Sequence, residues 1–533
     1  MKSSCSYIAY QETNMFSKLI SDYLEKKDFI QSFYSCQTDL DGLSKAITAR
    51  QQFSTDRNLI QQVFADAYAT VDASEFQMDN IAALSNDNTF TICTAHQPNI
   101  FTGYLYFIYK TAHVIALAQQ FNKEFPDKKF VPVFYIGSED NDLDELSKFK
   151  IHGRGYVWNT DQTGAVGRMK VDKSVVKLID EVEAELKHLP QSKSLIEILR
   201  KAYVLGNEMA TGTFILLNEL FKEYGLLVLQ PDHVDLKAKM KAVFKDDLLQ
   251  NSAEQIVGET SLKLEAEYKV QVNPRTVNLF YLRDGIRSRI DKRGNIYTVD
   301  GTVIRFTQEE LLQELNEFPD RFSPNVILRG IYQETILPNL VFVGGGSEVA
   351  YWMQLKNLFT HYKVPFPMLV LRNSFMIMDA NHAHKMAALG IGEVDLFKEE
   401  TQLANELVQR WSGQEISLEQ EELDSKALFQ HLKKRAGEID KTLVQHVHSL
   451  ETDHLKKLDG LEKKMLKAER KKQAIQLQRI WKLKEELFPN NNLQERVDNF
   501  IPYYAQYGQA FIEAVLQHSL GLEQRFGVLT VGG

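Results

Sequence analysis

Two short apolar runs between residues 91 and 145 each stop at a dense cluster of polar residues. The first run opens residues 91–103, and residues 104–121 then repeat apolar positions at the spacing of a helix. The second run, residues 130–136, ends at the polar residues 137–145. Strand, loop, helix, strand and loop form the βαβ unit of a parallel sheet, whose ligands bind beyond the carboxyl ends of the strands. We therefore expect both polar clusters to lie at a substrate site.

Three later apolar runs extend this pattern, at residues 225–229, 336–343 and 368–371. Each is short, bounded by turn residues and followed by polar residues, as expected of a buried strand. Eight βα units cannot be found, so the sequence predicts an α/β fold with a Rossmann-like, doubly wound parallel sheet rather than a barrel. Residues 1–90 have helical periodicity and are expected to be helices that cover the sheet.

The predicted catalytic core covers residues 1–385 and carries two insertions. The first lies near residues 150–217, where short alternating runs give way to helical periodicity. The second lies near residues 251–330 and contains a β-rich stretch with glycine turns, which indicates a small antiparallel sheet. Residues 496–533 are expected to pack back on the core.

Residues 386–495 are expected to form a helical coiled-coil domain. Between residues 396 and 488 glycines are few, prolines are absent, and Lys, Glu, Gln and Leu dominate. Leu450, Leu458 and Leu461 approximate a heptad seam. A single helix cannot bury its own seam, so either residues 428–439 fold back on it or a second subunit covers it. The second alternative predicts a homodimer.

Composition argues against several classes of protein. The net charge of −9 argues against a general nucleic-acid binder. No apolar run approaches the ~20 residues of a membrane span, and no signal peptide is evident. The three cysteines form no zinc-binding or disulfide pattern, so no zinc is expected. The sequence thus predicts a cytoplasmic protein without a membrane or nucleic-acid partner.

The first polar cluster contains the candidate catalytic residues His96, Gln97 and Thr102, with Gly103 and Tyr106 as candidate substrate-binding residues. Neither a P-loop nor the GxGxxG fingerprint of dinucleotide binding is present. A strand followed by a loop and a helix start can still hold a phosphate on free backbone N–H groups, to which His96 could donate. The alternative is a histidine with a structural role only.

The second polar cluster places five acids in residues 139–145, of which Glu139, Asp140 and Asp142 are candidate catalytic residues. One or two such acids are explained by capping of a helix. Their position after a buried strand favours a second role, the binding of a substrate ammonium or of Mg²⁺, both of which need carboxylate oxygens. Both interpretations remain open from the sequence.

A glycine run after the fourth strand, Gly344, Gly345 and Gly346, precedes Glu348 and a predicted helix. Glycine lets the backbone approach a ligand closely, and the helix start supplies N–H donors. Arg372, at the end of the last strand, could bind a carboxylate or phosphate bidentately, or form a surface ion pair. These residues are candidates for substrate binding.

Several of these motifs together resemble the BshC family of bacillithiol biosynthesis over nearly the whole chain. The resemblance rests on His96-Gln97 with Thr102-Gly103, on residues 139–142, and on residues 329–339 with 347–352. It adds Asn339, Tyr351 and Trp352 as candidate substrate-binding residues. It implies a ligase that joins the carboxyl group of cysteine to the amine of glucosaminyl-malate, a link to an adenine nucleotide (ATP or ADP), and a homodimer formed through the coiled coil. Amide formation from a free carboxylate needs an activated acyl group.

Two other functions stay open from the sequence. One is a nucleotidyltransferase that uses the same loops on a sugar phosphate, which would release pyrophosphate and incorporate no cysteine. The other is a coiled-coil scaffold with an inert sheet. Polar clusters at three strand ends argue against the scaffold, because such a protein would not need them.

Overall fold

The computed structural model describes residues 1–412 and 416–532. The chain divides into two compact units. The first holds residues 1–11, 15–380 and the segment from residue 492 onward, and the second holds residues 12–14 and 381–491. Each unit is described by itself.

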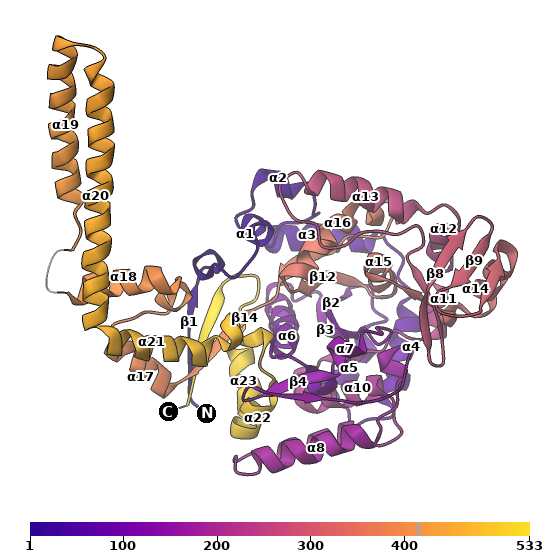
Figure 1. Ribbon diagram of the computed structural model, residues 1–533. Helices are drawn as coiled ribbons and strands as arrows, with labels where there is room; N and C mark the ends of the chain where they lie inside the picture. The colour runs from indigo at the N-terminus through magenta and orange to yellow at the C-terminus, as the bar shows by residue number, and fades with distance from the viewer. Residues whose placement is uncertain (413–415, 533) are drawn as a thin grey trace. The chain divides into compact units, whose positions relative to one another are not determined.

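A five-stranded parallel sheet forms the centre of the first unit (Figure 1). Its strands are β2 (Thr89–His96), β3 (Lys129–Ile136), β6 (Leu227–Leu229), β12 (Asn339–Gly344) and β13 (Met368–Leu371). They lie in the order β13-β12-β2-β3-β6, and every neighbouring pair is parallel. Each of the five predicted runs is one of these strands, so the predicted Rossmann-like sheet is confirmed. The strand order reverses direction between β2 and β12, which is where doubly wound sheets bind their ligands.

Helices cover both faces of this sheet. The principal ones are α3 (Leu40–Gln51), α6 (Tyr106–Glu124), α10 (Met209–Phe221), α15 (Val326–Ile336) and α16 (Gly346–Tyr362). Phe134 of β3 contacts Phe107 of α6 at 4.7 Å between ring centroids, whereas Phe342 of β12 stacks on Trp352 of α16 at 4.3 Å. Phe134 aligns with Thr94, and Phe342 with Cys93, so the two rings point to opposite faces. Helices α6 and α16 therefore lie on opposite faces and start at neighbouring strand ends.

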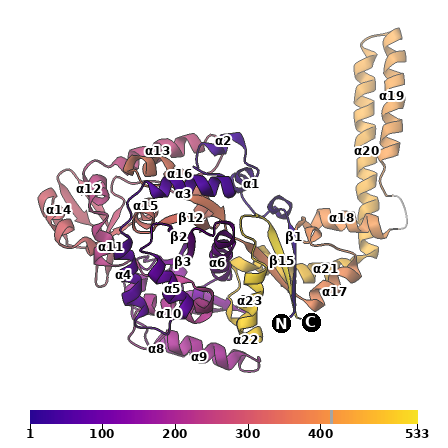
Figure 2. The same cartoon turned by 180° about the vertical axis from the view of Figure 1, so that it is seen from behind.

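The first insertion follows β3. It contains α7 (Leu143–Leu146), the hairpin β4 (Lys148–Ile151) and β5 (Arg154–Val157), and the helices α8 (Lys173–Leu186), α9 (Ser192–Ala202) and α10. The three long helices pack together (Figure 2).

The second insertion follows β6 and two short helices, α11 (Val234–Ala238) and α12 (Lys241–Leu249). It contains α13 (Ser252–Leu264), α14 (Gln308–Glu317) and a five-stranded antiparallel sheet in the order β10-β9-β8-β7-β11. The strands of this sheet are β7 (Leu279–Arg283), β8 (Ile286–Arg293), β9 (Ile296–Val299), β10 (Arg305–Thr307) and β11 (Phe322–Pro324).

The N-terminal residues depart from the prediction of helices alone. Residues Ser3–Ile8 form strand β1, which pairs antiparallel with β15 (Phe526–Val531), and β15 pairs parallel with β14 (Ser374–Asp379). This strand depends on a partner at the other end of the chain, which no local pattern indicates. The helices that follow are α1 (Lys18–Leu24), α2 (Asp28–Gln31), α3, α4 (Arg57–Tyr68) and α5 (Glu75–Ala83), and two C-terminal helices are α22 (Ile501–Tyr507) and α23 (Gln509–Gln517).

The second unit is helical. Its helices are α17 (Ala380–Leu389), α18 (Glu400–Trp411), α19 (Glu419–Ile439), α20 (Leu443–Lys472) and α21 (Ala474–Leu487). Helix α19 folds back along α20 as a long hairpin (Figure 1). Leu450 and Leu461 stay 48% exposed, so the hairpin leaves part of the predicted seam uncovered. Among the described residues, no helix combines the length and apolar character needed to cross a membrane.

Candidate functional site

A cavity of about 620 Å³ opens at the carboxyl ends of β2, β3 and β12. It therefore lies where the strand order of the parallel sheet reverses. The sequence-predicted site residues that line it are His96, Gln97, Tyr106, Glu139, Asp140, Gly345, Gly346, Glu348, Tyr351 and Arg372. The folding of one sheet brings together residues that are up to 276 positions apart (96 to 372).

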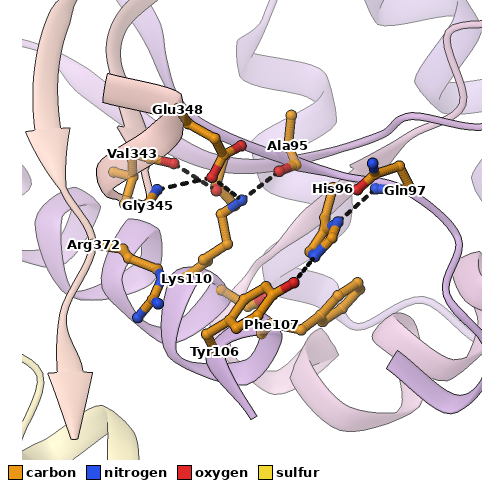
Figure 3. Close-up of polar contacts among 12 residues, drawn as sticks. Ala95, His96, Gln97, Tyr106, Phe107, Lys110, Val343, Gly345, Glu348 and Arg372 are labelled. Atoms are coloured by element: carbon orange, nitrogen blue, oxygen red, sulfur yellow. Dashed lines mark hydrogen bonds and ion pairs between the residues drawn. The ribbon is translucent and has the colours of Figure 1, made fainter. Parts of the chain in front are cut away.

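His96 ends strand β2 and uses both of its ring nitrogens (Figure 3). Its Nδ1 accepts a hydrogen bond from the backbone N–H of Gln97 at 2.8 Å, and its Nε2 lies 3.1 Å from Oη of Tyr106. The ring also stacks on Tyr106 and on Phe107. Burial lowers the pKa of His96 to about 3, and the nearby ammonium of Lys110 lowers it as well. His96 is therefore neutral at physiological pH.

A buried lysine joins the starts of α6 and α16 (Figure 3). Nζ of Lys110 donates to the carbonyl oxygen of Ala95 at 2.6 Å and to Oε2 of Glu348 at 2.7 Å. The same carboxylate oxygen accepts from the backbone N–H of Gly345, the N-cap residue of α16, which is the one half of a capping box that a glycine allows. Burial lowers the pKa of Lys110, which the Glu348 carboxylate partly offsets. The pair fixes the glycine loop against the end of β2.

Arg372 follows β13 and is already bound by a carboxylate. Its Nη1 and Nη2 donate to the two oxygens of Glu495 at 2.9 and 2.7 Å, and both side chains are buried. Its guanidinium carbon lies 5.0 Å from the ring centroid of Tyr106. The guanidinium group that could have bound a substrate anion is thus bound by Glu495. We therefore place Arg372 in the wall of the cavity.

The acidic cluster divides into residues with different surroundings. Glu139 is buried and forms an ion pair with Lys237, whose side chain has no exposed surface. Lys237 also lies 3.2 Å from Asp232, which Arg168 binds bidentately. Burial raises the pKa of Glu139, although Lys237 opposes that shift. Because Glu139 has its own cation, it is poorly placed to receive another.

The other acids of this cluster include one helix cap. Asp142 accepts from the backbone N–H of Glu145 at 3.2 Å and caps α7, and it does not line the main cavity. Asp140 lines the cavity and accepts from Nε2 of Gln97 at 3.2 Å. Glu145 also lines it, and partial desolvation together with the charges of Asp142 and Asp140 raises its pKa. Within residues 1–412 and 416–532, neither Asp140 nor Glu145 has a cationic group at ion-pair distance, although both line the cavity.

Thr102 and Gly103 lie in a tight turn that does not line the cavity. Phe101 and Thr102 have positive φ angles of 48° and 67°, and Gly103 has a φ of 66°. A Cβ on Gly103 would stand 2.9 Å from Cβ of Asn99, so only glycine fits. Asn499 holds the turn by donating to the carbonyl oxygens of Phe101 and Gly103. We assign Thr102 and Gly103 a structural role, because the turn that they form directs the backbone from β2 into α6.

Asn339, Gly344 and Trp352 also lie outside the cavity lining. Asn339 is the first residue of β12, at the amino end of the strand and away from the cavity. It donates to Glu334, which forms a buried ion pair with Arg50. Gly344 is buried at the end of β12, and Trp352 is buried against the sheet. These three residues therefore contribute to packing and not to the cavity, whereas Tyr351 lines the cavity.

Sequence reasoning missed most of the cationic residues of the site. Lys110, Arg287, Arg329 and Arg496 line the cavity, and they come from α6, β8, α15 and the C-terminal segment. No shared motif marks them, because they meet only in the folded chain. The weak signal available was Arg329, which opens the stretch that resembles the BshC family.

A second cavity of about 390 Å³ adjoins the first and shares Asp140, Arg287, Asn325 and Val326 with it. It adds Arg275 and Arg289. Within the described part of the chain, Arg275, Arg287, Arg289, Arg329 and Arg496 have no carboxylate at ion-pair distance. Across residues 1–412 and 416–532, no group of three or more His, Cys, Asp or Glu side chains could hold a metal ion.

A Rossmann-like sheet with two insertions, a charged cavity at its switch point and a separate helical hairpin define the class of this protein. Sequence comparison gives the same two parts: "Bacillithiol biosynthesis BshC, N-terminal Rossmann-like domain" matches residues 3–373, and the corresponding "C-terminal coiled-coil domain" matches residues 375–531. The chain belongs to the BshC family.

Curated relatives align over almost their full length. The chain is 36% identical to a protein of Flavobacterium johnsoniae, with 98% of this chain and 99% of the relative covered. It is 37% identical to a protein of Christiangramia forsetii, with both chains covered completely. A relative in Cytophaga hutchinsonii is 34% identical, with 96% of each chain covered. All three are named "Putative cysteine ligase BshC".

Proposed function

We propose that this protein is a cysteine ligase of bacillithiol biosynthesis, which joins the carboxyl group of cysteine to the amine of glucosaminyl-malate. The observation that carries the proposal is the charge pattern of the cavity. The same space is lined by arginines that have no carboxylate at ion-pair distance among the described residues, and by carboxylates that have no cation there. Such a site suits an acceptor that carries both an ammonium and two carboxylates. Membership of a bacillithiol-biosynthesis family, with relatives named putative cysteine ligase, supports the proposal.

The arginines are assigned to the anionic groups. Guanidinium groups bind carboxylate and phosphate oxygens through paired N–H donors. Arg329 is half-buried, Arg287 is shared by the two cavities, and Arg496 comes from the C-terminal segment. The malate carboxylates of the acceptor need two such contacts. The adjoining cavity, with Arg275 and Arg289, gives room for a further anion.

The amine of the acceptor is assigned to Asp140 and Glu145. An ammonium must lose a proton before its nitrogen can attack an acyl carbon. A carboxylate with a raised pKa is a better proton acceptor than an ordinary one, and Glu145 has this property. Asp140, which Gln97 orients, would hold the ammonium. Glu139 is already neutralised by Lys237, and its role is to support the loop.

An adenine nucleotide would supply the driving force, because it can activate the cysteine carboxyl group for attack. The residues at the start of α16 fit a phosphate group. Gly345 and Gly346 leave the backbone accessible, and the N–H groups at the start of this 17-residue helix attract anions.

We also propose that the protein forms a homodimer through the second unit. The hairpin of α19 and α20 exposes a set of large apolar side chains, which a soluble monomer would expose to water at a cost. They are Leu423, Leu428, Leu432, Ile439, Leu443, Leu450 and Leu461. A second copy of the hairpin is the occupant that matches their heptad-like spacing.

The test of the ligase is the profile of low-molecular-weight thiols in cells that lack this protein. Loss of bacillithiol with accumulation of glucosaminyl-malate supports the ligase. An unchanged thiol profile eliminates it. Accumulation of an unreacted sugar phosphate, with bacillithiol intact, would instead favour a nucleotidyltransferase.

A further inference from the structure

The hydrogen bonds of His96 fix the position of its single ring proton. The backbone N–H of Gln97 can only donate, so Nδ1 of His96, at 2.8 Å, must accept and carries no proton. A neutral imidazole keeps one proton, which must then lie on Nε2. Burial of the ring maintains this neutral state at physiological pH. Stacking of the ring on Tyr106 and Phe107 prevents it from turning away (Figure 3).

The direction of the next hydrogen bond follows from this tautomer. Nε2–H of His96 faces Oη of Tyr106 at 3.1 Å, so the tyrosine oxygen accepts. Burial raises the pKa of Tyr106, so the hydroxyl keeps its own proton. Within the described chain, Oη of Tyr106 has no other hydrogen-bond partner. Because Tyr106 lines the cavity, its proton is free to be donated there.

We propose that His96 is a positioning residue that holds the Tyr106 hydroxyl as a donor to an anionic oxygen of the substrate. The surroundings select the class of ligand atom. The hydroxyl already accepts from His96, so its own proton needs an acceptor, and Arg329 and Arg496, which line the same cavity without a carboxylate at ion-pair distance in the described chain, can hold an anionic one beside it. The carboxylates of Glu348 and Glu145 also act on Tyr106 and raise its pKa, but Glu348 is paired with Lys110. A carboxylate oxygen or a phosphoryl oxygen meets this requirement, whereas an ammonium does not. This inference rests on the proposed function and gives His96 a role other than proton transfer.

Two substitutions of His96 separate the roles of its nitrogens. In His96→Gln the side-chain amide reaches the position of Nε2 and can still donate to Tyr106. In His96→Asn the amide reaches only the position of Nδ1, so it can bond to Gln97 but not to Tyr106. Tyr106→Phe removes the donated hydroxyl and keeps the ring. Thermal melts of each variant verify folding, and Tyr106→Phe remains informative because it removes one oxygen atom only.

The expected results form a double-mutant cycle measured as kcat/KM and as substrate affinity. Loss of a hydrogen bond to a charged group lowers kcat/KM about 10- to 100-fold, so we expect this loss in both Tyr106→Phe and His96→Asn. The double variant His96→Asn/Tyr106→Phe should be no worse than Tyr106→Phe alone. His96→Gln should recover most of the activity. The pH profile between pH 5 and 8 should be the same shape in the wild type and in His96→Gln.

Titrations of glucosaminyl-malate and of ATP distinguish the two sources of the anionic oxygen. Weaker binding of glucosaminyl-malate to Tyr106→Phe identifies a malate carboxylate, and weaker binding of ATP identifies a phosphoryl oxygen. The inference is overturned if the two single losses multiply in the double variant, or if His96→Gln is as poor as His96→Asn. Failure of the proposed function is a separate result, namely no product from the wild type, and the cycle can then be measured on binding alone.

Discussion

The ammonium of Lys110 lies 2.7 Å from Oε2 of Glu348 and joins the two helices that start at the switch point of the sheet. Burial raises the pKa of Glu348, but the charge of Lys110 more than offsets this effect, so the pKa is lowered. Glu348 is therefore ionised at neutral pH. The Lys110 side chain is 2% exposed, and that of Glu348 is 24% exposed.

Lys110→Met should destabilise the protein, because it leaves Glu348 without its cation. Breaking a fully buried pair costs about 3 to 5 kcal/mol, and the partial exposure of Glu348 reduces the expected loss to about 2 to 3 kcal/mol. The measurement is denaturant unfolding at pH 7. The control is Lys110→Met/Glu348→Gln, which removes the uncompensated charge and should be more stable than the single variant. A double variant that is less stable than Lys110→Met would contradict the pairing.

Asp140 and Asp142 should respond differently to substitution by asparagine. Asp140 faces the cavity, so Asp140→Asn should weaken binding of glucosaminyl-malate by about 2 kcal/mol or more, with little change in melting temperature. Asp142 caps α7, so Asp142→Asn should keep acceptor affinity and cost at most about 1 kcal/mol of stability. Calorimetric titration and thermal melts measure the two effects. Equal acceptor affinity in the two variants would remove Asp140 from the amine site.

The apolar face of the hairpin should control the oligomeric state. Leu428 and Leu450 are 57% and 48% exposed, so Leu428→Asp/Leu450→Asp should yield a monomer that keeps its helix content. Leu466 is buried in a cluster with Val408 and Leu477. The matched control Leu466→Ala should therefore lower the melting temperature without dissociating a dimer, because a buried leucine contributes about 2 to 5 kcal/mol. Light scattering that finds the double variant still dimeric would place the interface elsewhere.

Asp247 gives the first unit a specific dependence on pH. It is buried and accepts from the backbone N–H and the side-chain amide of Asn278, yet burial raises its pKa to about 7. The folded state thus binds a proton that the unfolded state releases near pH 4. This contribution to stability is fully present below pH 4 and is lost as pH rises to 7.

Asp247→Asn should remove this dependence. Between pH 5 and 7 the wild type should lose stability relative to the variant, by at most about 1.4 kcal/mol per pH unit. A hydrogen bond lost by the variant shifts its stability by an amount that does not change with pH. Thermal melts of both proteins at pH 5, 6, 7 and 8 measure the difference. Parallel curves would show that Asp247 does not titrate in this range.

The parts of the fold that the sequence predicts are those encoded by local patterns. A buried parallel strand is a short apolar run, and the polar residues after it mark its carboxyl end, so β2 and β3 and the cavity residues His96 and Asp140 were found. Strand β1 was missed because its pairing with β15 spans the whole chain.

The features that the sequence did not predict are ion pairs between residues that meet only in the folded chain. For Arg372 the sequence allowed either a substrate anion or a surface ion pair, and the structure shows a buried ion pair with Glu495, 123 residues away. In the sequence Glu139 belongs to one acidic cluster, but in the structure it forms an ion pair with Lys237 of α11. Lys110 lies within an apolar helix, where its sequence context gives no sign of a role. Ion pairs of this kind follow no periodicity and no fixed spacing in the sequence, so only the structure reveals them.

The most direct measurement is the mass of the product formed by the purified protein from cysteine, glucosaminyl-malate and ATP. A ligase yields a thiol whose mass equals cysteine plus glucosaminyl-malate less one water, and Arg329→Met should lower its rate of formation strongly while leaving the protein folded. A reaction that consumes ATP and attaches a nucleotide to a sugar, with cysteine left unchanged, would contradict the ligase.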